Sequence, residues 1–115
     1  MAVTAYATGT MTGQTVGTEV IVTNIAGPGV FVFELDLVNA VAGDAYMVRI
    51  YKMNVASGTA RSCLIGGPWS DAQTDDLIKT SIPLMTSLSD AQALRFGITQ
   101  TLGTAHDVPW KVWQA

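Results

Sequence analysis

The sequence predicts a single all-β domain, a jelly-roll-like β-sandwich of about eight short antiparallel strands. Three observations support this prediction: a length of 115 residues, a two-residue alternation of apolar and polar side chains, and turn residues spaced between the alternating segments. A domain of this length buries enough surface to fold without a disulfide or a metal. A helical period is not found, and Thr86–Leu94 is the one candidate for a helical turn.

The alternation is clearest in segment 30–38, where Phe31 and Phe33 lie on one face and Glu34 and Asp36 on the other. The same pattern predicts further strands at Tyr46–Tyr51, Ile78–Leu84, Leu94–Leu102 and Val108–Val112, with shorter candidates near Val3–Thr10, Thr18–Ile25 and Arg61–Ile65. Glycine-rich turns separate these segments. Two of them, Gly58-Thr59-Ala60 and Gly103-Thr104-Ala105, are expected to be hairpin connections with glycine in a left-handed conformation.

These alternations also predict which side chains form the core. The expected core residues are Phe31, Phe33, Leu35, Val48, Ile50, Phe96, Ile98 and Trp110. In the strand at 78–84, the apolar face is expected to carry Ile78, Ile82 and Leu84. Cys63 is the single cysteine, so an intrachain disulfide and a cysteine-based zinc site are excluded, and we expect it to be a small buried hydrophobic residue.

Residues 1–17 form either an N-terminal extended segment or the first strand, and residues 18–115 form the sandwich domain. Val3, Ala5 and Ala7 alternate with polar or larger residues. This pattern suits a strand added to the edge of a sheet, either the chain's own sheet or that of a neighbouring subunit.

Charged residues make up 13% of the chain, against about 25% in an average domain. The six basic residues are scattered and are outnumbered by nine acidic ones, so binding to nucleic acid is not expected. A secretory signal and a membrane span are not expected either, because no basic cluster or long apolar run follows Met1. The low charge predicts that other protein covers part of the surface. The alternative is that Thr, Ser, Gly, Asn and Gln supply the polar surface.

No catalytic, cofactor or metal site is expected, and an enzyme is therefore not expected. His106 and Asp107 are neighbours on a chain segment that would point them to opposite faces. Glu34 and Asp36 share a strand face, but this face is expected to lack the cleft that a pair of glycosidase carboxylates would require. The acidic segment 71–76 lacks the spacing and the glycine of an EF-hand loop, so it is interpreted as a solvated loop.

Four residues are the candidates for an interface: Val3, Tyr6, Trp69 and Trp113. Trp69 follows Gly66-Gly67-Pro68 and is expected on a loop, and Trp113 falls in the register opposite to Trp110. An exposed tryptophan can anchor a protein interface or stack on a sugar ring, whereas packing beneath a loop remains the alternative.

Three segments, Gly103–Val112, Ser57–Arg61 and Gly17–Glu19 before a valine-rich strand, resemble small virion proteins of tailed bacteriophages. The resemblance implies a capsid decoration (cement) protein that binds the outside of the head lattice and stabilises it. Its expected partners are the major capsid protein or other virion proteins, and its own copies in a dimer or trimer, assembled in the host cytoplasm. Two other interpretations stay open. One is a tail, neck or fibre component; the other is a carbohydrate-binding β-sandwich module, favoured if Trp69 and Trp113 share one exposed surface.

Overall fold

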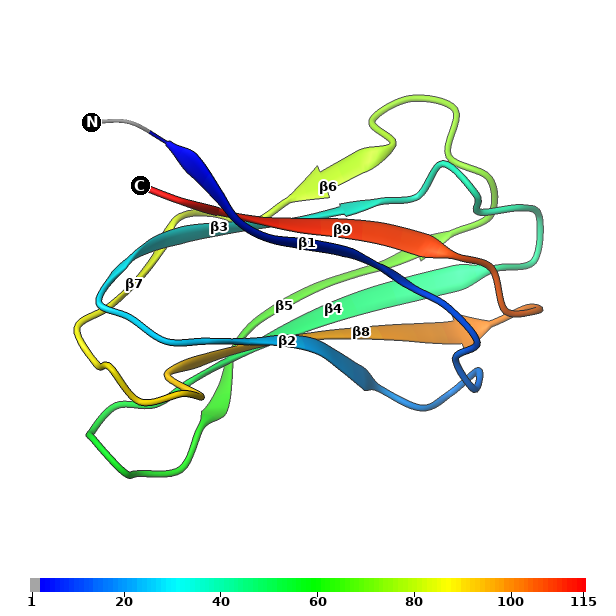
Figure 1. The fold of residues 1–115 in the computed structure, drawn as a ribbon. Helices are drawn as coiled ribbons and strands as arrows, with labels where there is room; N and C mark the ends of the chain where they lie inside the picture. The colour runs from blue at the N-terminus through cyan, green and yellow to red at the C-terminus, as the bar shows by residue number, and fades with distance from the viewer. Residues whose placement is uncertain (1–2) are drawn as a thin grey trace.

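In the computed structural model, which describes residues 3–115, the chain is all-β, as the sequence predicts, and these residues contain no helix (Figure 1). Nine strands form two antiparallel sheets. The strands are β1 (Thr4–Met11), β2 (Val20–Ile25), β3 (Gly29–Asp36), β4 (Ala45–Lys52), β5 (Arg61–Ser70), β6 (Ile78–Thr80), β7 (Leu84–Thr86), β8 (Leu94–Leu102) and β9 (Val108–Gln114).

The topology is that of a jelly roll. Sheet A contains the order β1-β9-β3-β6, with β7 also paired to β3, and sheet B contains the order β2-β8-β4-β5. Early strands therefore pair with late strands in reverse order: β1 with β9, β2 with β8, β3 with β6 and β7, and β4 with β5. This order arises when one long antiparallel hairpin is rolled up into two facing sheets. The start of β1 and the end of β9 lie at the same end of the sandwich (Figure 1).

The predicted strand at 78–84 is interrupted. Its two halves, β6 and β7, both pair with β3, and Ser81, Ile82 and Pro83 lie between them. Proline has no N–H to donate to a ladder, so pairing cannot run through this point without a break. The candidate helical turn at Thr86–Leu94 was wrong, because its first residue ends β7, its last residue begins β8, and the residues between them form an irregular connection with a turn.

The core lies between the inner faces of the two sheets, as predicted. Seven of the eight expected core residues are buried, and Trp110 is partly buried against the same cluster. Aromatic rings join the sheets: Phe33 of sheet A packs edge-on against Phe96 of sheet B, with ring centroids 5.2 Å apart. Phe96 packs in turn against Trp110 at 6.3 Å. Such edge-to-face contacts add to the stabilisation from burial.

The expected apolar face of strand 78–84 was partly wrong. Ile78 and Ile82 are 54% and 64% exposed, whereas Lys79 is partly buried. The cause is the register of β6, in which Lys79 lies opposite the buried Leu35, and neighbours across a ladder share a face. The edge strand β6 therefore turns a lysine inward.

Cys63 is exposed, so the expectation of a buried residue was wrong. Ile50 pairs with Leu64 and Tyr51 with Ser62, which leaves Cys63 as an extra residue in a β-bulge on the edge strand β5. Partial desolvation raises the pKa of its thiol, against the opposing effect of Lys52.

The two Gly-Thr-Ala connections differ from each other. Segment 53–60 joins β4 to β5 as a hairpin, but its left-handed residue is Ser57, with φ of 58°, and not Gly58. Gly103 has the expected left-handed φ of 93°. Its connection is not a hairpin, however, because it carries the chain from sheet B to sheet A.

Of the two alternatives for residues 1–17, the described part shows the first strand. β1 pairs with β9 along the full length of the strand, and Met11 at its end is buried in the core. In this structure β1 is the edge strand of the chain's own sheet A.

Candidate functional site

The structure separates the four candidate interface residues into two pairs. Tyr6 and Trp69 lie in or beside β-bulges and pack against core residues, whereas Val3 and Trp113 lie on the outer face of sheet A. In β1, Ala5 pairs with Trp113 and Ala7 with Val112, so Tyr6 is the extra residue. At this bulge the Tyr6 ring packs edge-on against Phe31 at 5.3 Å, while 38% of Tyr6 remains exposed. Its hydroxyl accepts a hydrogen bond from the Ala26 backbone N–H at 3.3 Å.

Trp69 is turned inward, and it belongs to strand β5 instead of the expected loop. Tyr46 pairs with Trp69 and Val48 with Gly66, so Gly67 and Pro68 together face one residue of β4. This bulge shifts the alternation by one position and directs Trp69 toward the core, against which it packs. Gly66 is required there, because an added Cβ would lie 2.9 Å from the Trp69 ring.

Val3 and Trp113, in contrast, lie together on the outer face of sheet A. With Val32 they line one shallow apolar depression, in which Val32 pairs directly with Trp113. Val30 continues the same face of β3 and pairs with Met85, which is 66% exposed. We call this set of residues the outer-face patch: Val3, Val30, Val32, Met85 and Trp113.

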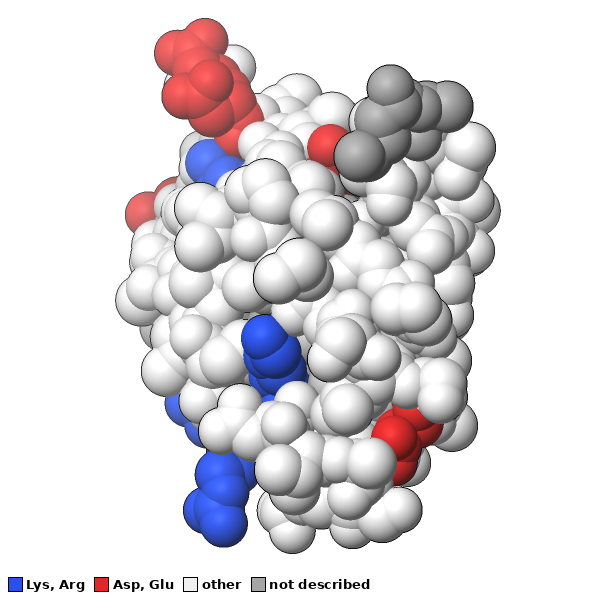
Figure 2. All heavy atoms as spheres, turned by 90° about the vertical axis from the view of Figure 1, so that its left-hand side faces the viewer, with Lys and Arg blue, Asp and Glu red and all other residues white. Residues whose placement is uncertain are grey.

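Few charges surround the outer-face patch. The Lys111 ammonium lies 4.3 Å from the centre of the Trp113 ring, and Lys111 pairs across the sheet with Glu34. Figure 2 faces the end of the sandwich at which β1 begins and β9 ends, and most of that surface is neither acidic nor basic. This end of the sandwich therefore carries few charges.

Trp69 and Trp113 do not share a surface. Trp69 lies on the inner side of sheet B, and Trp113 lies on the outer face of sheet A. The condition that would favour a carbohydrate-binding module is therefore not met.

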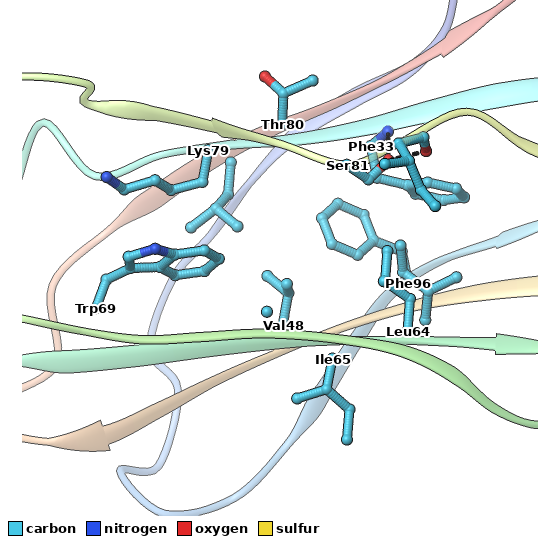
Figure 3. A pocket seen from close by; sticks show the side chains of 13 residues that line it. Phe33, Val48, Leu64, Ile65, Trp69, Lys79, Thr80, Ser81 and Phe96 are labelled. Carbon is cyan, nitrogen blue, oxygen red and sulfur yellow. Dashed lines mark hydrogen bonds between the residues drawn. The ribbon is translucent and has the colours of Figure 1, made fainter.

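A cavity of about 220 Å³ lies between the edge strands β5 and β6, on the side of the sandwich where the two sheets do not pair (Figure 3). Phe33 and Phe96 form one end of it, and Trp69 and Lys79 form the other (Figure 3). Ile65 and Thr80 of the same strands point away from it (Figure 3). Sequence reasoning missed this cavity, because both the bulge before Trp69 and the register of β6 depend on pairing partners.

A polar cluster surrounds the buried carboxylate of Asp44, where the β3–β4 and β8–β9 connections meet. Its Oδ2 atom accepts hydrogen bonds from the Tyr46 hydroxyl at 3.1 Å and from the Val41 N–H at 3.1 Å. The same oxygen lies 2.8 Å from Nδ1 of His106, which is one-third exposed. Burial, and then the charge of Asp44, raise the pKa of the Tyr46 hydroxyl above its usual range.

Two glutamines extend this cluster. Gln14 donates from Nε2 to Gln100 Oε1 and to the His106 backbone carbonyl, both at 2.7 Å. Gln100 donates in turn to the backbone carbonyls of Leu102 and Thr104. Gly103 is needed here, because a Cβ at this position would collide with the Asp44 carboxylate. The cluster therefore holds the β8–β9 connection against the β3–β4 connection.

The partner of His106 is Asp44 and not its neighbour Asp107. Among residues 3–115, no hydroxyl or thiol is hydrogen-bonded to the His106 ring, so the pair activates no nucleophile in this structure. Within the same range, no group of three or more His, Cys, Asp or Glu side chains is placed to hold a metal ion. In the acidic loop, the Asp71 carboxylate accepts a hydrogen bond from the Gly43 N–H.

The outer face of sheet B carries a polar contact between Tyr51 and Glu19. The Tyr51 hydroxyl donates to Glu19 Oε1 at 2.7 Å, and this hydrogen bond raises the pKa of Tyr51. The Glu19 carboxylate lies over Gly97, where a Cβ would be 2.8 Å from it. These residues lie on an open sheet face and line only a shallow depression.

Comparison of the chain with protein-family models, with curated proteins and with solved structures found no match. In the described part of the chain there is no helix of the length and apolarity that a membrane crossing needs.

Proposed function

We propose that the protein is a structural component of a tailed-phage virion, a decoration protein that binds the outside of the capsid lattice through the outer-face patch. The observation that carries the proposal is the apolar depression on the outer face of sheet A, where the partly exposed Trp113 and Val32 lie beside the exposed Val3. Buried aromatic anchors dominate the binding energy of protein interfaces. An exposed apolar surface of this kind typically marks an interaction site.

Three further features agree with this function. The jelly roll is used by viral capsid domains, although the same fold also serves lectins and therefore does not decide the function. The sequence resembles small virion proteins at its turns and strands. Sheet A ends in the edge strand β1, which is available for pairing with a second copy in a dimer or trimer.

The first test is the copy number of the protein in purified particles of the phage that encodes it, measured by quantitative mass spectrometry. A copy number close to that of the major capsid protein is expected. A handful of copies per particle would instead assign it to the tail or neck, and absence from the particle would overturn the proposal.

The second test locates the binding surface. Trp113→Ser is expected to abolish binding of the added protein to particles that lack it, while the melting temperature stays close to that of the wild type. Ile65→Ser is the matched control, because Ile65 is 54% exposed on the outer face of sheet B. Equal binding by the two variants would show that the outer-face patch is not the contact.

A further inference from the structure

We propose that the cavity between β5 and β6 binds a small ligand with an apolar body and one anionic group, such as a medium-chain carboxylate. This inference concerns a different face of the molecule from the outer-face patch and does not depend on the proposed function. Four observations carry it: the volume of the cavity, its lining, the inward direction of Lys79, and the absence of a carboxylate partner for that lysine within residues 3–115.

The volume is large for an unfilled apolar space. Protein interiors pack closely and leave few voids larger than a water molecule. The cavity measures about 220 Å³, and an apolar cavity of roughly 150 Å³ is known to be sufficient to bind benzene. A single ring or a short aliphatic chain would therefore fit.

The lining selects an apolar body. Leu64 and Val48 of sheet B face Phe33 of sheet A across the space, and the Phe96 ring closes one end (Figure 3). The one hydroxyl directed toward it, that of Ser81, is already engaged: it accepts from the Phe33 N–H and donates to the Ile82 carbonyl. A ligand would therefore find hydrophobic contacts in the cavity and no free hydroxyl.

Lys79 supplies the charge. Its Nζ atom lies 5.8 Å from the centre of the Trp69 ring at the mouth of the cavity. Across residues 3–115, no carboxylate oxygen lies within ion-pair distance of this ammonium group. A carboxylate whose chain fills the cavity would place its charge at the same mouth, where a partly desolvated ion pair forms a stronger contact than one in open water.

An inward-pointing lysine can also protect an edge strand from pairing with other chains. That role needs neither a cavity behind the lysine nor an aromatic wall beside it. Binding of a charged ligand distinguishes the two roles, because edge protection alone predicts no preference for an anion.

The test is a titration of the ¹⁵N-labelled protein by NMR with octanoate, kept below its micelle concentration, and with 1-octanol as the uncharged probe of equal length. We expect saturable shifts at the Trp69 indole N–H and at amides of β5 and β6, with octanoate binding more tightly. Lys79→Gln should weaken octanoate binding by about tenfold and leave octanol binding unchanged. Lys111→Gln is the matched control, because Lys111 also lies over a tryptophan, but on the open outer face.

A second variant, Leu64→Phe, fills the cavity from the edge strand. It should abolish binding of both probes while the spectrum remains that of a folded protein. If Leu64→Phe does not fold, the comparison of Lys79→Gln with Lys111→Gln decides alone. The proposal is overturned if octanoate gives no saturable shifts at the cavity, if its shifts centre on Trp113, or if Lys79→Gln and Lys111→Gln bind it equally well.

Discussion

Asp44 and His106 join two connections that lie far apart in the sequence: the carboxylate Oδ2 of Asp44 is 2.8 Å from Nδ1 of His106. Nδ1 is buried, and within the described chain it makes no hydrogen bond, because the short contact with the carboxylate lacks hydrogen-bond geometry. Asp44 therefore lies beside the inner edge of the imidazole without accepting a hydrogen bond from it.

Asp44→Ala is expected to lower the free energy of unfolding by about 2–4 kcal/mol. The substitution leaves the Tyr46 hydroxyl and the Val41 N–H without their acceptor in a buried site, and it removes the carboxylate that lies beside His106. Urea denaturation measures the loss. Asp107→Ala is the control, because Asp107 is exposed and only its backbone carbonyl is used, by Asn39. Equal losses for the two variants would mean that the cluster does not stabilise the fold.

The raised pKa of the Tyr46 hydroxyl leads us to expect that the free energy of unfolding falls at alkaline pH. Its pKa in the folded protein is raised above the usual value of 10.0, first by burial and then by Asp44. The folded state therefore keeps a proton that the unfolded state releases, so this stabilisation is full below about pH 10 and decreases as the pH rises further. The decrease cannot exceed about 1.4 kcal/mol per pH unit for one proton.

Urea denaturation between about pH 9 and about pH 11 measures this dependence, together with tyrosinate absorbance. In Tyr46→Phe the decrease should be less steep, although the variant is less stable at neutral pH because its hydrogen bond to Asp44 is lost. If the free energy of unfolding falls with pH equally steeply in the wild type and in Tyr46→Phe, then Tyr46 is not the group responsible.

The alternation of side chains was sufficient to predict the fold. Most of the strands and the buried faces of β3, β4 and β8 follow from residues that are close in sequence, such as Phe31 and Phe33. Jelly-roll pairing was predicted as a class from the number and spacing of the strands. These features are local, and a single sequence contains them.

The predictions that were wrong concern residues whose burial depends on their pairing with other strands. Trp69 and Cys63 lie in or beside β-bulges, and a bulge shifts the alternation by one residue only because of what it faces on the next strand. Ile78 is exposed because the register with β3 assigns the inner face to Lys79. His106 was compared only with its neighbour Asp107, although its partner is Asp44.

Phe96→Ala is expected to lower the free energy of unfolding by about 3–5 kcal/mol, the usual cost of removing a buried aromatic ring. Phe96 is 1% exposed and contacts the rings of both Phe33 and Trp110. It also closes one end of the cavity, so part of the space left behind can be filled by water, which favours the lower end of this range. Val55→Ala, at a side chain 65% exposed, should cost under about 0.5 kcal/mol. A loss below about 1 kcal/mol for Phe96→Ala would contradict the core described above.

Deletion of Met1–Thr10 is expected to unfold or severely destabilise the protein, rather than only remove a contact with another subunit. The deletion takes away nearly all of β1, so β9 loses one of its two partner strands and Phe31 loses the Tyr6 ring. It would also open the backbone of β9 as a new sheet edge, at which chains tend to pair and aggregate. Circular dichroism and size-exclusion chromatography of the truncated chain measure the outcome.

The control is a shorter deletion of residues 1–3, which leaves β1 whole and removes Val3 from the outer-face patch. This variant should fold, melt close to the wild type, and bind particles more weakly if the outer-face patch is the contact. If the longer deletion instead folds normally and loses only particle binding, then β1 acts as an arm whose main partner is another subunit. In that case the pairing of β1 with β9 contributes little to the stability of the single chain.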